Sequence, residues 1–428
     1  MSSSDLADAR DLCRFIDQSP SAAHAVAQVA AQLGTHGFTT LDLSAPAWGL
    51  APGRYLVRRG GSVVAFVIRA AAFRRLHLVG AHTDSPHLRL KPQAAYACEG
   101  CLQLGVEVYG GALYNSWLDR DLGVAGTVHT ADGVSHLVRI HRPLARVAQL
   151  AVHLDRTVND NGLKLNPQTQ LAPLWGLQPE GAGPGEASRR FAAELGLADS
   201  AIIAHELSLY DLTPATLAGA DEELIFAGRL DNLASCHAGV TALLGSIDGE
   251  SEVLPMLALF DHEEVGSRSD TGADGMLLWS ILERIAGELG MGRSALHASL
   301  AGSLMISADM AHALHPNYPE KHEPRHRPLL GKGVVLKTNA NVRYATSAAS
   351  AARIRRLAAA NDVPLQDFVA RGDIGCGSTI GPSAAAHLGI AVCDLGTPML
   401  SMHSARECAA SADHAPYIRL LSAHLRGA

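Results

Sequence analysis

The stretch Leu76-His77-Leu78-Val79-Gly80-Ala81-His82-Thr83-Asp84 passes from an apolar run directly into a histidine and an aspartate. A short run of this kind, without alternating polar residues, is typical of a strand buried on both faces of a parallel sheet. In open α/β sheets, ligands bind beyond the carboxyl ends of such strands. The stretch therefore predicts a buried strand whose end carries part of a functional site.

Four more apolar runs have the same form, with acidic or histidine residues close behind them. They are Leu224–Phe226 before Asp231, Val253–Phe260 before Asp261-His262-Glu263-Glu264, Ser303–Ser307 before Asp309, and Ala391–Leu400 before Met402-His403-Ser404. After Arg229 such runs alternate with Ala- and Leu-rich helical stretches, which is the pattern of a mostly parallel sheet. If the five runs are neighbouring parallel strands, their polar ends meet in one crevice.

The texture of the chain differs between Leu88 and Phe226. Short segments of alternating polarity indicate a β-rich unit there, and the Gly- and Pro-rich composition of Gln178–Arg190 predicts a loop. The chain has 428 residues, which is enough for two or three structural units at about 150 residues each. We expect an α/β fold with a mixed, mostly parallel sheet flanked by helices, formed by residues 1–87 and 229–428. A β-rich insertion over residues 88–228 interrupts it.

Composition narrows the range of partners. Apolar residues make up 47% of the chain and charged residues 18%, so a large core is expected and extensive disorder is excluded. The net charge is 35 − 42 = −7, and no run of Lys and Arg provides the basic face that a nucleic-acid or membrane binder normally carries. We therefore expect no nucleic-acid partner and no membrane partner.

The cysteines suggest where the protein works. Seven cysteines are too few and too scattered for a secreted disulfide framework, and the first residues lack the basic and apolar parts of a signal peptide. A cytoplasmic location is expected. The pair Cys98-Glu-Gly-Cys101 has redox-motif spacing, but a single such pair is interpreted as two ordinary thiols.

The residue types at the strand ends point to metal ions. Two imidazoles and three or more carboxylates suit two divalent cations that share one carboxylate. Without cations, several carboxylates held close together would repel one another strongly. Each group also has a plainer interpretation, since an Asp after a strand often caps a helix. Their joint occurrence favours the metal site.

Chemistry suggests two further roles. Asp84 follows His82 by two residues and can accept its second ring proton, which fixes the orientation of the imidazole. Glu263 and Glu264 are adjacent, so their side chains leave the backbone in different directions. One can bind metal while the other acts as general base, and their position alone does not say which.

Longer motifs lie at Gly80–Pro86, Arg229–Asn232, Asp261–Ser267, Asp309–Ala313, His315–Tyr318, Lys321–Glu323, Arg343–Ala345, Gly377–Pro382 and Met402–Ser404. Together they resemble the aspartyl aminopeptidases, a family of cocatalytic zinc exopeptidases that form tetrahedral dodecamers. The motifs occur in family order and cover essentially the whole chain. The resemblance implies a zinc-exopeptidase fold and makes the insertion a dimerisation domain.

The resemblance also implies the roles of individual residues. The implied metal ligands are a bridging Asp231, His82 and Asp309 at one ion, and Glu264 and His403 at the other. Glu263 would be the general base and Asp84 the carboxylate that orients His82.

Three substrate-binding residues are implied in the same way. Lys337 would face the acidic side chain of the substrate, through a charge-assisted hydrogen bond, with Tyr344 in the same segment. His153 of the insertion would reach the active site of a neighbouring subunit. The plainer interpretations are a surface lysine at a strand end and a histidine on an amphipathic strand.

The sequence thus predicts a metallo-aminopeptidase that removes N-terminal residues, preferentially Asp or Glu, from short peptides. It would use two divalent ions, Zn²⁺ in the first place with Mn²⁺ or Co²⁺ as alternatives, within a homo-oligomer, the dimer-based tetrahedral dodecamer. Two other functions stay open. One is a dinuclear dipeptidase or N-acyl amino-acid deacylase, and the other is a non-catalytic shell protein that metal ions stabilise.

Overall fold

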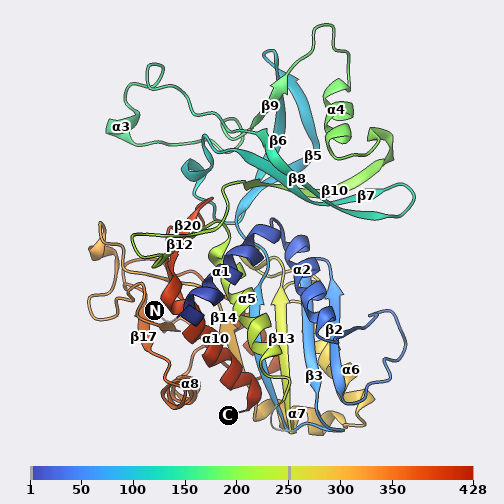
Figure 1. Cartoon of the computed structure of the whole chain (residues 1–428), viewed down its shortest axis with the longest axis vertical. Coiled ribbons are helices and arrows are strands. Elements are labelled where there is room, and N and C mark those ends of the chain that lie inside the picture. The colour runs from blue at the N-terminus through green and yellow to red at the C-terminus, as the bar shows by residue number, and fades with distance from the viewer. Residues whose placement is uncertain (1–2, 249–251, 428) are drawn as a thin grey trace. The chain divides into compact units, whose positions relative to one another are not determined.

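The computed structural model describes residues 3–248 and 252–427, and they fall into two compact units (Figure 1). The first unit contains the chain up to Asp84, Ala215–Met402 and the chain from Glu407 onward. The second unit contains Ser85–Pro214 and His403–Arg406. The first unit is thus assembled from both ends of the chain.

Among the described residues, a nine-stranded sheet forms the centre of the first unit. In spatial order its strands are β1 (Thr39–Thr40), β2 (Gly53–Arg59), β3 (Ser62–Ile68), β13 (Val253–Phe260), β4 (Arg75–His82), β14 (Leu304–Ala308), β18 (Ala391–Gly396), β16 (Val334–Thr338) and β17 (Leu365–Val369). The central strands β13, β4, β14 and β18 are parallel, whereas β3 and β16 join them in antiparallel orientation. The predicted α/β fold with a mixed, mostly parallel sheet is confirmed.

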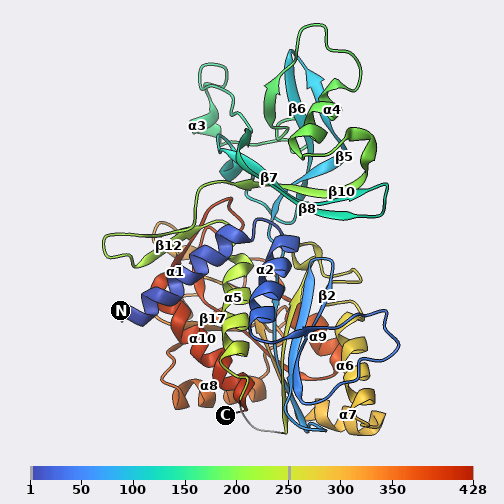
Figure 2. The same ribbon diagram turned by 45° about the vertical axis from the view of Figure 1, so that its right-hand side comes forward.

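Helices cover both faces of this sheet, as the turned view of Figure 2 shows. One face carries α1 (Ser3–Gln18), α2 (Ala22–Thr35), α5 (Leu230–Leu244), α8 (Ala348–Ala360) and α10 (Ser411–Arg426), and the other carries α6 (Leu277–Glu288), α7 (Arg293–Ala301) and α9 (Ile380–Leu388). Along β4, Val79 and Ala81 pack into the first core, and Leu76 and Leu78 into the second. Because both faces of the strand are buried, its sequence is an almost unbroken apolar run.

A smaller sheet also belongs to the first unit. Its order is β11 (Thr216–Ala218), β12 (Leu224–Ala227), β20 (Glu407–Ala410), β19 (Pro398–Leu400) and β15 (Ala311–His312). The expectation that the run Leu224–Phe226 lies beside the other four in the parallel sheet is wrong, because this run forms β12 and pairs antiparallel with β11 and β20. Arg229 then adopts a left-handed conformation (φ 59°) and the chain turns directly into α5.

The second unit is built on an antiparallel sheet with the order β8-β7-β10-β5-β6-β9. The strands are β5 (His87–Cys98), β6 (Cys101–Tyr109), β7 (Leu122–Thr130), β8 (Ser135–Ala145), β9 (Leu174–Leu177) and β10 (Ile202–Asp211), and short helices α3 (Val158–Asn161) and α4 (Glu186–Glu194) connect them. The β-rich character predicted for this part of the chain is confirmed. The loop predicted over Gln178–Arg190 is wrong in its second half, because α4 begins at Glu186.

No helix in the described part of the chain is long and apolar enough to cross a membrane.

Candidate active site

The polar residues that follow β4, β13 and β14 meet at one edge of the parallel sheet. His82 is the last residue of β4 and pairs with Phe260, the last residue of β13, so Glu263 and Glu264 follow just beyond it. Asp309 comes directly after β14. Parallel strands in register end at the same level, which is why residues separated by more than 200 positions lie together.

Four side chains form a close cluster at this edge. His82 Nε2 lies 3.4 Å from Asp231 Oδ1 and 3.8 Å from Asp309 Oδ1. One ligand atom each of His82, Asp231 and Glu264 lies within 4.8 Å of the other two. Asp231 enters from the first turn of α5, not from a strand end. Of the two glutamates, Glu264 is the one whose carboxylate joins this group.

Asp84 organises the cluster from behind. Its two carboxylate oxygens accept hydrogen bonds from the backbone N–H groups of Glu263 (3.2 Å) and Glu264 (3.1 Å). His82 Nδ1 lies 3.0 Å from the backbone oxygen of Asp84 and 3.4 Å from its Oδ1. Asp84 therefore holds both the imidazole of His82 and the turn that carries the two glutamates. The sequence indicated the contact with His82 but not the contact with the turn.

The electrostatics of the cluster favour cations. Burial raises the pKa of Glu263 to about 8. Burial and the charge of Asp231 raise the pKa of Glu264 well above its usual range. Burial acts to lower the pKa of His82, but its hydrogen bonds to Asp231 and Asp309 raise it overall. The cluster thus retains protons that divalent cations would displace, so a set of one imidazole and several carboxylates fits metal ions.

Three side chains support the cluster from outside it. The Cys236 thiol donates to the backbone oxygen of His82 (2.9 Å), Glu407 accepts from the Asp231 N–H (3.1 Å), and Asn232 Nδ2 donates to the backbone oxygen of Ala308 (2.8 Å). The sequence patterns indicated none of these roles. Asn232 stands inside a quoted motif, but Cys236 and Glu407 act on partners 154 and 176 positions away, so no local pattern marks them.

Lys337 is buried behind Asp309. Only 2% of its side chain is exposed, and its Nζ donates to the backbone oxygens of Asp309 (2.9 Å) and Met310 (3.0 Å). It lies 3.7 Å from Asp309 Oδ2 and 5.1 Å from the ring centre of Tyr344. The interpretation of Lys337 as a surface lysine is therefore wrong, and Tyr344 is its neighbour.

His403 and His153 belong to the second unit, whereas the cluster belongs to the first. His403 has a left-handed backbone (φ 69°) and its Nδ1 lies 3.1 Å from the backbone oxygen of Gly111. His153 is exposed in a turn that follows β8. The plainer interpretation of His153, a place on an amphipathic strand, is wrong.

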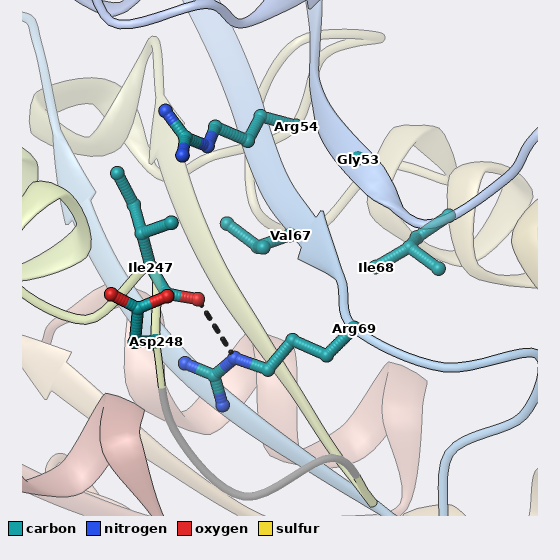
Figure 3. Close-up of a pocket in the computed structure, with 7 residues that line it drawn as sticks. All are labelled: Gly53, Arg54, Val67, Ile68, Arg69, Ile247 and Asp248. Atoms are coloured by element: carbon teal, nitrogen blue, oxygen red, sulfur yellow. Dashed lines mark hydrogen bonds between the residues drawn. The ribbon is translucent and has the colours of Figure 1, made fainter.

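A pocket of about 400 Å³ elsewhere in the first unit is lined by Gly53, Arg54, Val67, Ile68, Arg69, Ile247 and Asp248 (Figure 3). Its two arginines already have structural partners. Arg54 donates to the backbone oxygen of His36 (2.7 Å), just beyond α2, and Arg69 donates to that of Ile247 (3.1 Å), just beyond α5. Arg54 thus satisfies the C-cap carbonyl of α2, Arg69 satisfies a carbonyl in the loop after α5, and the pocket holds none of the predicted site residues.

The fold and the cluster together define an α/β metallohydrolase. A buried imidazole, several carboxylates and an adjacent glutamate meet at the carboxyl ends of the central strands, where open α/β sheets bind their ligands, and these side chains suit a metal ion that activates water. The comparison with known families then specifies the class. Residues 15–425 match the family model described as aminopeptidase I zinc metalloprotease (M18), so the chain belongs to the M18 family and is an aminopeptidase.

Individual relatives agree with this assignment. A protein of Streptomyces coelicolor named "Probable M18 family aminopeptidase 2" is 44% identical over 409 residues, 94% of each chain. The structure titled "Cryo-EM structure of the Ape4 and Nbr1 complex" superposes with a TM-score of 0.94 at 38% identity and covers 99% of this chain and 86% of that one. The "S. cerevesiae mApe1 dodecamer" gives a TM-score of 0.84 at 28% identity over 98% of this chain and 97% of that one. The family resemblance inferred from the motifs is confirmed.

Proposed function

We propose that this aminopeptidase removes single N-terminal residues, preferentially Asp or Glu, from short peptides, and that it uses two divalent metal ions. The observation that carries the proposal is the cluster at the end of β4. There, ligand atoms of His82, Asp231 and Glu264 converge within 4.8 Å, with Glu263 next in sequence and Asp309 3.8 Å from His82.

The ligands would form two sets that share Asp231. His82 and Asp309 would hold one ion and Glu264 the other, and His403 joins the second set on the family resemblance alone. Zn²⁺ is proposed for both positions, in keeping with the name of the family, and Mn²⁺ and Co²⁺ suit the same donors. When bound, such ions polarise a carbonyl group and lower the pKa of water toward about 7.

Glu263 would be the general base. Its carboxylate would take a proton from the attacking water and pass it to the amine of the departing peptide. The N–H of Glu263 is held at 3.2 Å by the Asp84 carboxylate, which limits the directions in which the side chain can leave the backbone. The N–H of Glu264 is held by the other oxygen of the same carboxylate. The two adjacent side chains therefore leave the turn in different directions, which would allow them separate roles.

The substitution Glu263→Gln tests this role. We expect it to lower the turnover of Asp-Ala-Ala by about 10²–10⁴-fold, the usual contribution of general base catalysis, while the metal content stays unchanged. Glu283→Gln is the matched control, because Glu283 on α6 pairs with Arg293 at the start of α7, away from the cluster. Near-normal turnover of Glu263→Gln with its metal ions in place would refute the proposal.

Lys337 would select the acidic side chain. An ammonium group has three N–H donors, and two of them go to the backbone oxygens of Asp309 and Met310. The third would be directed at the carboxylate of the substrate. Because Lys337 is buried, its charge is weakly screened, which strengthens a charge-assisted hydrogen bond.

The ratio of kcat/KM between Asp- and Leu-initiated tripeptides measures this preference. Lys337→Met should reduce the ratio by about 10–100-fold, the value of a hydrogen bond to a charged group. The ratio distinguishes recognition of the acidic side chain from mere positioning of Asp309. Losing the hydrogen bonds to the backbone oxygens of Asp309 and Met310 would lower kcat/KM for both peptides alike and leave the ratio unchanged. An equal loss on both peptides would mean that Lys337 only positions Asp309.

The proposal includes a homo-oligomer, with the dodecamer as the expected form, in the cytoplasm. The second unit exposes Leu150 (58%), Val152 (51%) and Leu154 (75%) beside His153. A concentration of exposed apolar side chains commonly marks a protein contact, and the solved yeast relative carries the word dodecamer in its title. We infer that this segment is covered by another subunit and that His153 acts there on its substrate.

A further inference from the structure

The hairpin of β5 and β6 in the second unit brings two cysteines face to face. Cys98 ends β5, Cys101 begins β6, and the two residues are direct partners in the antiparallel ladder. Between them, Glu99 (φ 48°) and Gly100 (φ 75°) both have positive φ, as a two-residue type I′ turn requires. Directly opposed residues place their side chains on the same face of a hairpin.

The spacing of such partners suits a disulfide. The Cα atoms of opposed residues in antiparallel strands lie about 4.5–5.5 Å apart, and disulfides span about 4.4–6.8 Å. Both thiols are free, Cys98 is exposed and Cys101 is partly exposed, so an oxidant can reach them. Cys408 is also partly exposed but stands opposite Phe226 and Leu400, so no thiol faces it across the ladder.

We propose that Cys98 and Cys101 form a reversible disulfide when the protein meets a low-molecular-weight disulfide such as oxidised glutathione. The Cys98 thiolate attacks one sulfur of the oxidant, which leaves a mixed disulfide and releases one thiol. The Cys101 thiolate then attacks Cys98 Sγ, forms the Cys98–Cys101 bond and releases the second thiol. The pair gives up two electrons, and its two protons end on the released thiols.

Closing the bond would affect the edge of the sheet. Cys101 pairs with Leu177 on the edge strand β9, and Gly100 accepts a hydrogen bond from the Gln178 N–H (2.9 Å). A disulfide across the turn therefore fixes the end of the hairpin to which β9 is attached. Exposed disulfides are the readily reduced ones, so the bond acts as a reversible clip.

Peptide mapping by mass spectrometry tests the pair in the intact, assembled enzyme. After oxidised glutathione is added, the peptide with Cys98 and Cys101 should lose two hydrogen atoms and carry no glutathione, and dithiothreitol should reverse the change. Cys408 should at most accumulate a glutathione adduct. In Cys98→Ser, Cys101 should retain glutathione, because no second thiol displaces it.

A register control separates geometry from mere proximity in sequence. Cys98→Ser combined with Ala97→Cys keeps two thiols close together, but residue 97 points to the opposite face of the strand. This variant should carry glutathione on both thiols and close no ring. The proposal is wrong if the unmodified hairpin retains glutathione at Cys98 or Cys101, links to another subunit, or closes no faster than the register control.

Discussion

At the scale of single residues, Asp84 links the His82 end of β4 to the turn that carries Glu263 and Glu264. Its side chain accepts from the N–H groups of Glu263 and Glu264, while His82 Nδ1 lies close to its backbone oxygen. Ligands contributed by different strands need such a common partner, because small independent shifts would separate them. Groups behind a metal ligand tune affinity and activity for this reason.

Asp84→Asn removes one acceptor while it preserves size. One of the two N–H groups would then face an amide NH₂ in place of a carboxylate oxygen. We expect metal affinity or turnover to fall about 10–100-fold, measured by metal titration and by hydrolysis of Asp-Ala-Ala. Asp42→Asn is the control, because Asp42 also accepts a backbone N–H, from Ser44, but in an exposed position. Unchanged values for Asp84→Asn would contradict the linking role.

The sequence could predict residues whose role is local. Asp84 beside His82 and the adjacent glutamates were visible as motifs, and the structure brings them together with Asp231 and Asp309. The position of the two glutamates left open which of them joins the cluster, because neighbouring side chains differ only in direction, and Glu264 was implied by the family resemblance alone. The supports Cys236 and Glu407 were invisible for the related reason that their partners are distant in sequence.

At the scale of elements, β18 approaches the chain that carries Asp309 unusually closely. A Cβ at Gly396 would lie 1.9 Å from the backbone oxygen of Asp309 and 2.6 Å from its carbonyl carbon. Both neighbours are backbone atoms, so they cannot move aside as a flexible side chain can. Gly396 is therefore a condition for the position of Asp309.

Gly396→Ala should displace Asp309 and weaken metal binding, at a cost of about 1–3 kcal/mol in the free energy of unfolding, as is typical of overpacking. Metal titration and denaturant unfolding measure the two effects. In the control Gly302→Ala, the nearest atom to the new Cβ is 3.7 Å away, which is an ordinary contact. Equal behaviour of both variants would show that β18 can retreat without moving Asp309.

A second contact between elements depends on pH. Asp413 in α10 is buried, and its carboxylate accepts from the N–H groups of Gly331 (2.8 Å) and Gly333 (2.7 Å), just before β16. Burial raises its pKa from 3.8 to about 6, although the two N–H groups act in the opposite direction. The folded state therefore binds the proton more tightly than the unfolded state.

This shift predicts the sign of a stability change. The contribution of Asp413 is greatest below about pH 4 and falls as the pH rises to about 6, because the buried carboxyl must ionise. Relative to Asp413→Asn, which does not titrate, the original protein should lose up to about 3 kcal/mol of unfolding free energy across this window. Denaturant unfolding of both proteins between pH 4 and 7 gives the difference, and a flat or rising difference would contradict the burial effect.

Elements could be predicted where their burial is uniform. The apolar runs gave β4, β13, β14 and β18 because both faces of these strands are covered. The same rule misplaced Leu224–Phe226, since an apolar run does not reveal which sheet it joins. Helix α4 was missed because Gly and Pro precede it, and its place depends on packing of Phe191 against Trp175.

At the scale of the whole molecule, function is proposed to depend on assembly. The sequence indicated a split α/β part and a β-rich insertion, but it cannot show which surfaces meet in an oligomer, because contact surfaces have no periodic signature. The exposed segment around His153 is the feature of the second unit that an assembly would explain. The dimerisation role of the insertion over residues 88–228 remains a prediction.

Mixing two defective variants decides whether His153 acts across a subunit boundary. Assemblies of His153→Ala alone lack the histidine at every site, and assemblies of Glu263→Gln alone lack the base, so we expect both to be nearly inactive. When equal amounts are dissociated and reassembled together, about a quarter of the original turnover should return, since half of the sites keep Glu263 and half of their neighbours supply His153. Mixing without dissociation is the control and should restore nothing. If reassembly also restores nothing while an affinity tag on one variant co-purifies the other, His153 serves only its own chain, because no site then has both groups.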